Sequence, residues 1–388
     1  MKNKIINICL IAVALVVTAF FIANNRIKLV LDDETRAVYI SYIEYTNHFI
    51  NKTEEELKIE IEEMVETVKK YNFNLIILQV RPFSDSIYKS EIFPTSSKIV
   101  SCEGCKLPLD ILDYFIKTAH KNNIKVHAWI NPYRISNNTD ISKISKSNPA
   151  YKWLNTNNVK VIENKGIYYN PASNEVQKLI VSGVEEIVLN YDVDGIHMDD
   201  YFYPDDTIDL ENYEEVKNTI SISDYRLSNT NNLVKSIYKM IKKIDDTVLF
   251  GISPDGNIEN SYNNNYADIK TWIQNEGYID YIMPQIYYGF FNSVKPFIET
   301  VNEWKDLIKI DIKFIPALAL YKSGTIDEYA KTGKDEWINN SDIISKQIKV
   351  IRNIDEIDGY SLFRYDYLLE TTNQNLRLEQ NNLLKVVK

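Results

Sequence analysis

The stretch VDGIHMDDYFYP, residues 193–204, decides the fold because it joins a buried strand to a group of polar and aromatic side chains. Residues 193–198 form a short run with the character of a strand covered on both faces. Asp199 and Asp200 follow at the point where the strand should end. Side chains alternate along a strand, so His197 and Asp199 are expected to share one face. The stretch therefore predicts two carboxylates at the carboxyl end of a parallel strand.

A strand followed by a helix recurs on both sides of this stretch. The other strands are predicted at 36–42, 74–80, 125–130, 248–253, 279–285, 313–319 and 359–364. Helices are predicted at 52–71, 107–122, 174–190, 229–244, 266–276, 293–307 and 341–353, with a closing helix after the last strand. Long loops are expected after strands three and four, at 131–171 and 200–228. Eight such units indicate an α/β fold, a closed (β/α)8 TIM-type barrel, with an open doubly wound sheet as the alternative.

The N-terminal segment has the pattern of a membrane anchor. Lys2 and Lys4 precede an apolar run over residues 5–23, which nearly reaches the roughly 20 residues that span a bilayer. We interpret residues 1–32 as a signal anchor and linker, and residues 33–388 as one barrel domain. The domain is then expected on the extracytoplasmic face of the cell membrane, or secreted if the segment is cleaved.

Composition excludes some classes of partner. A net charge of −10 and a pI near 5.1 argue against nucleic acid, which requires a concentrated basic face. The 27 tyrosines and 5 tryptophans suit stacking on sugar rings, although core packing would also account for them. Cys102 and Cys105 form a C-x-x-C that favours a loop disulfide over a redox or zinc site. No cofactor is expected, and the sequence offers no spacing typical of a metal site for His127 and His197.

Polar and aromatic residues follow most of the predicted strands, and the carboxyl ends of barrel strands form the active site in such folds. Glycosidic cleavage needs a proton donor and a carboxylate that attacks or stabilises the oxocarbenium-like carbon. We assign the second role to Asp199. The proton donor is left open among Asp200, Asp85 and Glu44, in that order. Asp200 could instead orient an arginine or a loop.

Six segments together resemble the bacterial glycosyl hydrolase-like 10 family. They are QVRPFSDSIY (79–88), VHAWINPYR (126–134), YYNPASNEV (168–176), NYDVDGIHMDDYFYP (190–204), FGISPDG (250–256) and YADIKTWIQNEGYIDYIMPQIYY (266–288). The resemblance implies exported glycosidases of the bacterial envelope that act on cell-wall glycan, with peptidoglycan strands lacking peptide stems as the favoured substrate. The catalytic pair would be Asp199 and Asp200. The family pattern also covers a set expected to bind substrate, namely Arg81, Asp85, His127, Asn131, Tyr133, Arg134, Asn170, His197, Tyr201, Gln285 and Tyr287. It lends no support to Asp255 or Asp366.

Two other functions stay open. Asp194–Asp199 has a shape similar to the strand-four motif of α-amylase-type barrels, which favours Asp199 as nucleophile and allows an exported hydrolase of another polysaccharide such as α-glucan. In chitinase-type barrels the acid follows at the position of Tyr201, so that acid is missing here. The lack of a glutamate at the ends of strands five and six also allows a non-catalytic barrel that only binds glycan.

Overall fold

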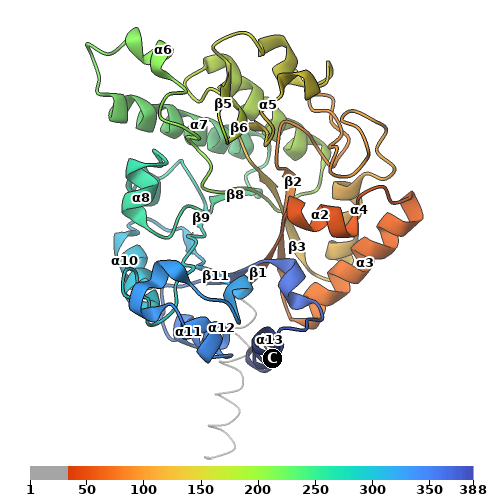
Figure 1. Cartoon of the computed structure of the whole chain (residues 1–388), viewed down its shortest axis with the longest axis vertical. Coiled ribbons are helices and arrows are strands. Elements are labelled where there is room, and N and C mark those ends of the chain that lie inside the picture. The colour runs from red at the N-terminus through yellow and green to blue at the C-terminus, as the bar shows by residue number, and fades with distance from the viewer. Residues whose placement is uncertain (1–33, 388) are drawn as a thin grey trace, which may run out of the picture. The chain divides into compact units, whose positions relative to one another are not determined.

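Eight parallel strands form a barrel wall, and helices surround it (Figure 1). The computed structural model describes residues 34–387. The strands of the barrel sheet are β1 (Thr35–Ile40), β2 (Leu75–Arg81), β3 (Lys125–Ile130), β7 (Gly195–Met198), β8 (Leu249–Ile252), β9 (Tyr281–Ile282), β10 (Lys313–Phe314), β11 (Ala317–Ala319) and β12 (Gly359–Phe363). Their order is β10-β9-β8-β7-β3-β2-β1-β12-β11. The predicted (β/α)8 barrel is confirmed.

The two end strands of that order, β10 and β11, are segments of one barrel strand interrupted near Pro316. A proline has no backbone N–H to donate to a ladder, so a break at this residue is expected. β10 pairs with β9, and β11 pairs with β12. Backbone hydrogen bonds continue across the break, from Ile315 N to Ile282 O at 2.9 Å and from Ser361 N to Pro316 O at 3.0 Å. These bonds on both sides of the seventh strand complete the ring.

Helices cover the outside of the barrel. Those that return the chain to the next strand are α3 (Glu54–Lys70), α4 (Ile111–Lys121), α5 (Asn174–Asn190), α7 (Ile222–Ile244), α8 (Ile258–Asn263), α9 (Ile269–Gln274), α10 (Phe297–Leu307) and α12 (Ile343–Ile351), and α13 (Gln374–Val386) closes the chain. Shorter helices are α2 (Tyr42–His48), α6 (Leu210–Glu214) and α11 (Glu336–Asn339). A capping box formed by Thr53 and Glu56 begins α3.

Alternate residues of each strand belong to two different cores. On β1, Val38 and Ile40 pack outward against the helices, whereas Ala37 and Tyr39 belong to a smaller cluster inside the barrel. Barrel interiors are filled by side chains in layers, so the interior is a packed core and not a pore. Here the interior cluster includes large aromatic residues, among them Trp129. These aromatics form the floor on which the carboxyl-end cavity rests.

Three local features differ from the sequence-based expectation. The first predicted strand ends early, because Ser41 caps α2 with a capping box completed by Glu44. The predicted loop over 131–171 contains a separate antiparallel sheet, in the order β4 (Arg134–Ser136), β6 (Gly166–Tyr169) and β5 (Val159–Ile162). Helix α7 begins seven residues before its predicted start, where Ser221 caps its first turn.

Two further expectations concern the cysteine pair and the N-terminal segment. Cys102 and Cys105 are joined in a disulfide, as the C-x-x-C loop suggested. The anchor predicted over residues 1–32 lies outside the described residues. Within residues 34–387, no helix is both long and apolar enough to cross a bilayer.

Candidate active site

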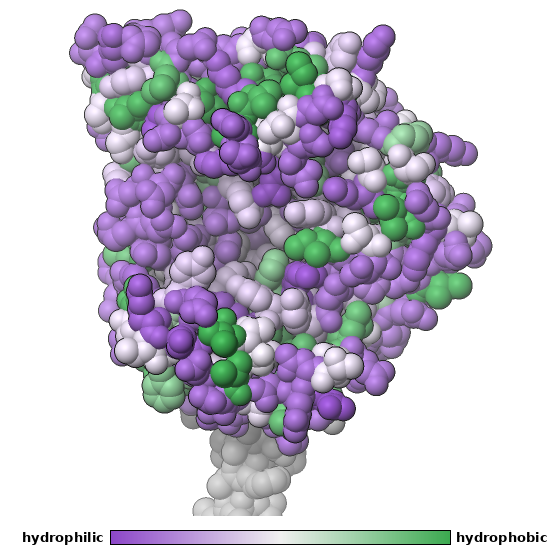
Figure 2. Space-filling view, viewed as in Figure 1, coloured by the Kyte–Doolittle hydropathy of each residue, from purple (hydrophilic) through white to green (hydrophobic). Residues whose placement is uncertain are grey.

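A cavity of about 250 Å³ lies at the carboxyl ends of the barrel strands, where active sites of this fold are built. The space-filling view shows the molecule hollowed near the centre of the barrel, within a mostly hydrophilic surface (Figure 2). The lining comes from seven strand ends or the loops that follow them: Tyr39, Ser41, Tyr42, Ile43, Gln79, Trp129, Arg134, Asp199, Asp200, Tyr201, Ser253, Gln285, Tyr287 and Phe363. Two adjacent carboxylates thus share a cavity with six aromatic side chains in its walls.

Asp199 is the more buried of the two carboxylates, with 5% of its surface exposed. The side-chain amide of Asn131 donates to its Oδ1 at 2.6 Å and to its Oδ2 at 2.7 Å. The backbone N–H of Tyr201 lies 3.4 Å from Oδ1. Donors aimed at both oxygens of a carboxylate favour its ionised form, because an anion accepts hydrogen bonds more strongly than a neutral acid.

The direction of these hydrogen bonds is fixed by a chain of amides that begins at the backbone. The N–H of Tyr42, which can only donate, bonds to Oε1 of Gln79 at 2.9 Å. The Gln79 amide nitrogen is therefore free to donate, and it does so to Oδ1 of Asn131. Asn131 must then present its own NH2 group to Asp199. The backbone at the start of α2 thus orients the Asn131 amide that contacts Asp199, acting through the side chain of Gln79.

Asp200 is half-buried and lies on the same cavity. It accepts a hydrogen bond from Nε2 of Gln285 at 3.2 Å, and Gln285 is held in turn by the carbonyl of Ser253 at 3.0 Å. Because β7 ends at Met198, strand alternation no longer separates the two aspartates. Asp199 and Asp200 can therefore face one space although they are adjacent in sequence.

The environment raises the pKa of both aspartates above the ordinary value. For Asp199 the largest cause is burial and the next is the negative charge of Asp200, while Arg134 and Asn131 act in the opposite direction. Burial also dominates for Asp200, opposed by the hydrogen bond from Gln285. Two carboxylates this close do not ionise independently, so one proton is held by the pair over a range of pH.

Arg134 supplies the positive charge of the cavity. Its guanidinium lies 4.3 Å from the ring centre of Tyr201 and 5.5 Å from that of Phe83. Burial lowers its pKa and the charge of Asp199 raises it, with a net increase, so it is always protonated. Tyr201 itself is 52% exposed and offers an aromatic face at the mouth of the cavity.

Two of the predicted substrate-binding residues, His127 and His197, lie inside the barrel and do not line the cavity. Their Nδ1 atoms both lie 2.9 Å from the hydroxyl of Tyr281. Burial lowers the pKa of His127 to about 3 and that of His197 well below its usual value, so both are neutral. Nε2 of His197 lies 3.3 Å from the hydroxyl of Tyr39, which does line the cavity. The histidines therefore support the cavity floor from below.

Five further predicted residues do not line the cavity, and one of them, Asn131, contacts Asp199 as described above. Arg81 stacks on Phe93 at 4.3 Å and packs against the Cβ-free face of Gly183 on α5, where an added Cβ would come within 2.1 Å of its Nη1. Asp85 is buried in the loop after β2, and burial raises its pKa to about 7. The others are Tyr133 and Asn170, which are both buried. Nδ2 of Asn170 donates hydrogen bonds to the backbone oxygen of Asn157 at 2.9 Å and to Oδ1 of Asn212 at 2.8 Å.

Glu44, a candidate proton donor, lies outside the cavity. It is fully buried, caps α2 and forms an ion pair with Arg364. Arg364 also pairs with Asp366 at 3.2 Å. Neither Glu44 nor Asp85 lines the cavity, so among the candidate acids only Asp200 shares the space with Asp199.

The structure adds lining residues that were not proposed from the sequence. Gln79, Trp129 and Ser253 stand at the ends of predicted strands, so their position was available from the strand assignment. Tyr39, Ser41, Tyr42 and Ile43 come from the first strand and the segment after it, where only Glu44 was proposed, and Phe363 comes from the eighth strand. The alternation of β1 would have placed Tyr39 inside the barrel.

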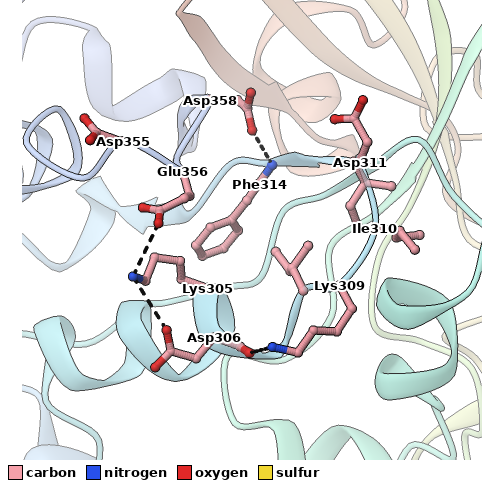
Figure 3. Close-up of a pocket in the computed structure, with 11 residues that line it drawn as sticks. Lys305, Asp306, Lys309, Ile310, Asp311, Phe314, Asp355, Glu356 and Asp358 are labelled. Atoms are coloured by element: carbon pink, nitrogen blue, oxygen red, sulfur yellow. Dashed lines mark hydrogen bonds and ion pairs between the residues drawn. The ribbon is translucent and has the colours of Figure 1, made fainter.

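A second, larger hollow lies at the opposite end of the barrel, between the start of β10 and the turn before β12 (Figure 3). Several of its charged groups are engaged with one another or with the backbone. Lys305 lies between Asp306 and Glu356 at 3.6 and 3.8 Å, and Asp358 accepts the backbone N–H of Phe314 at 2.8 Å. Among residues 34–387, no group of three His, Cys, Asp or Glu side chains is placed to hold a metal ion. The carboxyl-end cavity is thus the better candidate for an active site.

A (β/α)8 barrel with paired carboxylates and aromatic walls at the carboxyl ends of its strands has the architecture of a glycoside hydrolase. The chain belongs to the glycosyl hydrolase-like 10 family, whose model matches residues 34–340. It is 36% identical over 330 residues to glycosyl hydrolase YngK of Bacillus subtilis, covering 78% of this chain and 62% of that protein. Identity to glycosyl hydrolase DigH of Escherichia coli K12 is 32% over 335 residues, covering 78% and 74%. The chain therefore spans less than two thirds of the B. subtilis relative.

Solved structures agree on the fold. The PgaB (BpsB) glycoside hydrolase domain from Bordetella bronchiseptica superposes with a TM-score of 0.59 at 11% identity, covering 85% of this chain and 93% of that one. An α-amylase from Geobacillus thermoleovorans gives a TM-score of 0.52 at 10% identity, covering 92% and 77%. At such identities these similarities show the barrel alone.

Proposed function

We propose that this protein is a glycosidase that hydrolyses bacterial cell-wall glycan, with peptidoglycan strands lacking peptide stems as its substrate. The observation that carries the proposal is the pair Asp199 and Asp200 in one aromatic-walled cavity of a glycosyl hydrolase-like 10 barrel. Tyrosine and tryptophan faces suit sugar rings, and their polar edges suit hydroxyls. We further propose that the protein works at the extracytoplasmic face of the membrane, held by its N-terminal segment.

In this mechanism Asp199 is the ionised carboxylate. Asn131 donates to both of its oxygens, and the cation of Arg134 lies across the same cavity. Both favour the anion that attacks or stabilises the oxocarbenium-like carbon. Burial raises the pKa of Asp199 to about 7 and that of Asp200 to about 6, so these values alone would leave the shared proton on Asp199. We assign the proton to Asp200 instead, because Asp200 lacks the two amide hydrogen bonds that favour the anion of Asp199. Asp200 then donates the proton to the leaving oxygen.

The division of roles can be tested with an activated aryl glycoside, whose leaving group needs little protonation. Asp200→Asn should lose most of its activity on the glycan and retain much more on the aryl glycoside. Asp199→Asn should lose activity on both, because its role does not depend on the leaving group. Equal losses on the two substrates for Asp200→Asn would contradict its assignment as the acid.

The substrate is tested by incubating the wild-type protein with three polymers: peptidoglycan stripped of stems by an amidase, intact peptidoglycan, and starch. New reducing ends should form from the stripped glycan. Release from starch alone would select an α-glucan hydrolase. Retention of stripped glycan with no new reducing ends would select a barrel that only binds glycan, an alternative favoured by the lack of any glutamate in the cavity lining.

A further inference from the structure

Two loops on the barrel rim present the most exposed aromatic side chains among the described residues. Phe291 is 70% exposed and Tyr329 is 86% exposed. Val294 and Ile326, in the same two loops, are 56% and 51% exposed. We call these four residues the outer platform. Apolar side chains that gather on a surface, rather than being scattered singly, mark a site of interaction.

The outer platform is held in place by specific contacts between its loops. The buried carboxylate of Glu336 accepts the backbone N–H groups of Phe290 and Phe291, each at 2.9 Å. Gly333 packs so closely on the backbone of Phe291 that an added Cβ would come within 2.0 Å of its carbonyl oxygen. Ser293 N also bonds to Ala330 O at 3.3 Å. The aromatic rings are therefore carried on a fixed backbone despite their exposure.

The outer platform is continuous with the cavity. Its loops follow β9 and β11, so they leave the barrel at the same end as Asp199. Tyr287 lines the cavity and precedes Phe291 by four residues, a span of at most about 14 Å of extended chain. Nζ of Lys322 ties the second loop to this segment, donating to Tyr287 O at 2.8 Å and to Asp327 at 2.6 Å.

We propose that the outer platform binds the part of a glycan strand that extends beyond the cavity, by stacking against sugar rings. This inference rests on the proposed function and adds a second binding site for the same polymer. A cavity of about 250 Å³ lies below the roughly 300 Å³ at the lower end of pockets for drug-sized ligands, so a polymer must continue over the rim. Exposed Phe and Tyr rings offer the flat apolar faces that sugars require.

The test measures binding in an Asp199→Asn background, so that no glycan is consumed. Affinity is compared for long stripped glycan strands and for short oligosaccharides that the cavity alone can hold. Phe291→Ala/Tyr329→Ala should weaken binding of long strands several-fold and leave short oligosaccharides unaffected. Leu189→Ala is the matched control: this side chain is 62% exposed near the C-terminal end of α5, which leads to the amino end of β7.

Unchanged affinity of the double variant for long strands would overturn the inference, as would an equal loss for short and long ligands. The alternative occupant is a lipid surface. If the wild-type protein binds phosphatidylglycerol vesicles through these residues while glycan binding is unaffected by the double substitution, the platform contacts membrane instead. Because the readout is binding, absence of hydrolysis by the wild-type protein would refute the proposed function without deciding the platform's ligand.

Discussion

The side-chain amide of Asn131 donates hydrogen bonds to both carboxylate oxygens of Asp199, at 2.6 and 2.7 Å. Its orientation is imposed by Gln79 and, through it, by the backbone N–H of Tyr42. A buried carboxylate beside a second carboxylate would otherwise tend to be protonated. This amide chain therefore opposes the effect of burial and favours the anion of Asp199.

Replacing Asn131 by Asp keeps the shape of the side chain and removes the NH2 donor. It also adds a third acidic group against Asp199. We expect kcat to fall on the order of 10²-fold or more, as for other preorganised donors at a charged reacting centre. Steady-state kinetics on stripped glycan measure the change, and circular dichroism checks the fold. Activity within a factor of two of wild type would show that the Asn131 amide has no part in catalysis.

The raised pKa values of Asp199 and Asp200 set the pH profile. Activity requires Asp199 ionised and Asp200 protonated, so kcat/KM should be bell-shaped. The acid limb and the basic limb of this pH profile should both lie above the pH at which ordinary aspartates titrate. In Asn131→Ala the donors that favour the Asp199 anion are lost, its pKa rises, and the acid limb should move to higher pH. An acid limb that moves to lower pH, or does not move, would argue against Asn131 acting on this carboxylate.

Glu44 is expected to matter for stability and not for chemistry. Glu44→Gln removes the ion pair with Arg364 and weakens the cap of α2. The cost should be on the order of 1–3 kcal/mol, below the range for breaking a fully isolated buried pair, because Asp366 still pairs with Arg364. Chemical denaturation measures it. A variant of wild-type stability that has lost activity would return Glu44 to the list of proton donors.

Asp85 should destabilise the fold as the pH rises. Its folded-state pKa of about 7 lies above the ordinary aspartate value, so between about pH 4 and pH 7 the folded state keeps a proton that the unfolded state has lost. Stability attributable to this group is present at low pH and falls as pH approaches 7. Asp85→Asn should therefore be more stable than wild type at pH 8, by about 1.36 kcal/mol for each pKa unit, and the advantage should vanish near pH 4.

Thermal unfolding at several pH values follows this difference. A stability difference between wild type and Asp85→Asn that is the same at pH 4 and pH 8 would exclude the buried, protonated state of Asp85. The same variant also tests the sequence-based prediction that Asp85 binds substrate. An increase in KM with normal stability would favour that role over a structural one.

The barrel was predictable from the sequence because its signals are local. Each strand is a short apolar run, each helix has its own periodicity, and their order repeats eight times. Features that depend on partners distant in sequence were missed. Strands β4, β5 and β6 pair only with one another within a predicted loop. The capping box of Ser41 and Glu44 that begins α2 is, by contrast, a local signal that the sequence contains.

The site was predictable only in part, for a related reason. The strand ends identify Asp199, Asp200, Arg134, Gln285 and Tyr287, which line one cavity. Sequence position does not say which way a buried polar side chain points. Arg81 also stands at the end of a predicted strand, but its side chain packs outward against α5. His127 and His197 lie below the cavity, where both contact Tyr281. The amide chain from Tyr42 to Asn131 likewise depends on the relative placement of three strands.

The most direct test of the central claim compares Asp199→Asn with wild type for release of new reducing ends from stripped glycan. Asp358→Asn is the matched control, since Asp358 is a half-buried aspartate at the opposite end of the barrel, where it accepts the backbone N–H of Phe314 at 2.8 Å. We expect Asp199→Asn to fold, bind glycan and release no detectable product, while Asp358→Asn stays active. Full activity of Asp199→Asn would contradict the assignment of this carboxylate as the catalytic group.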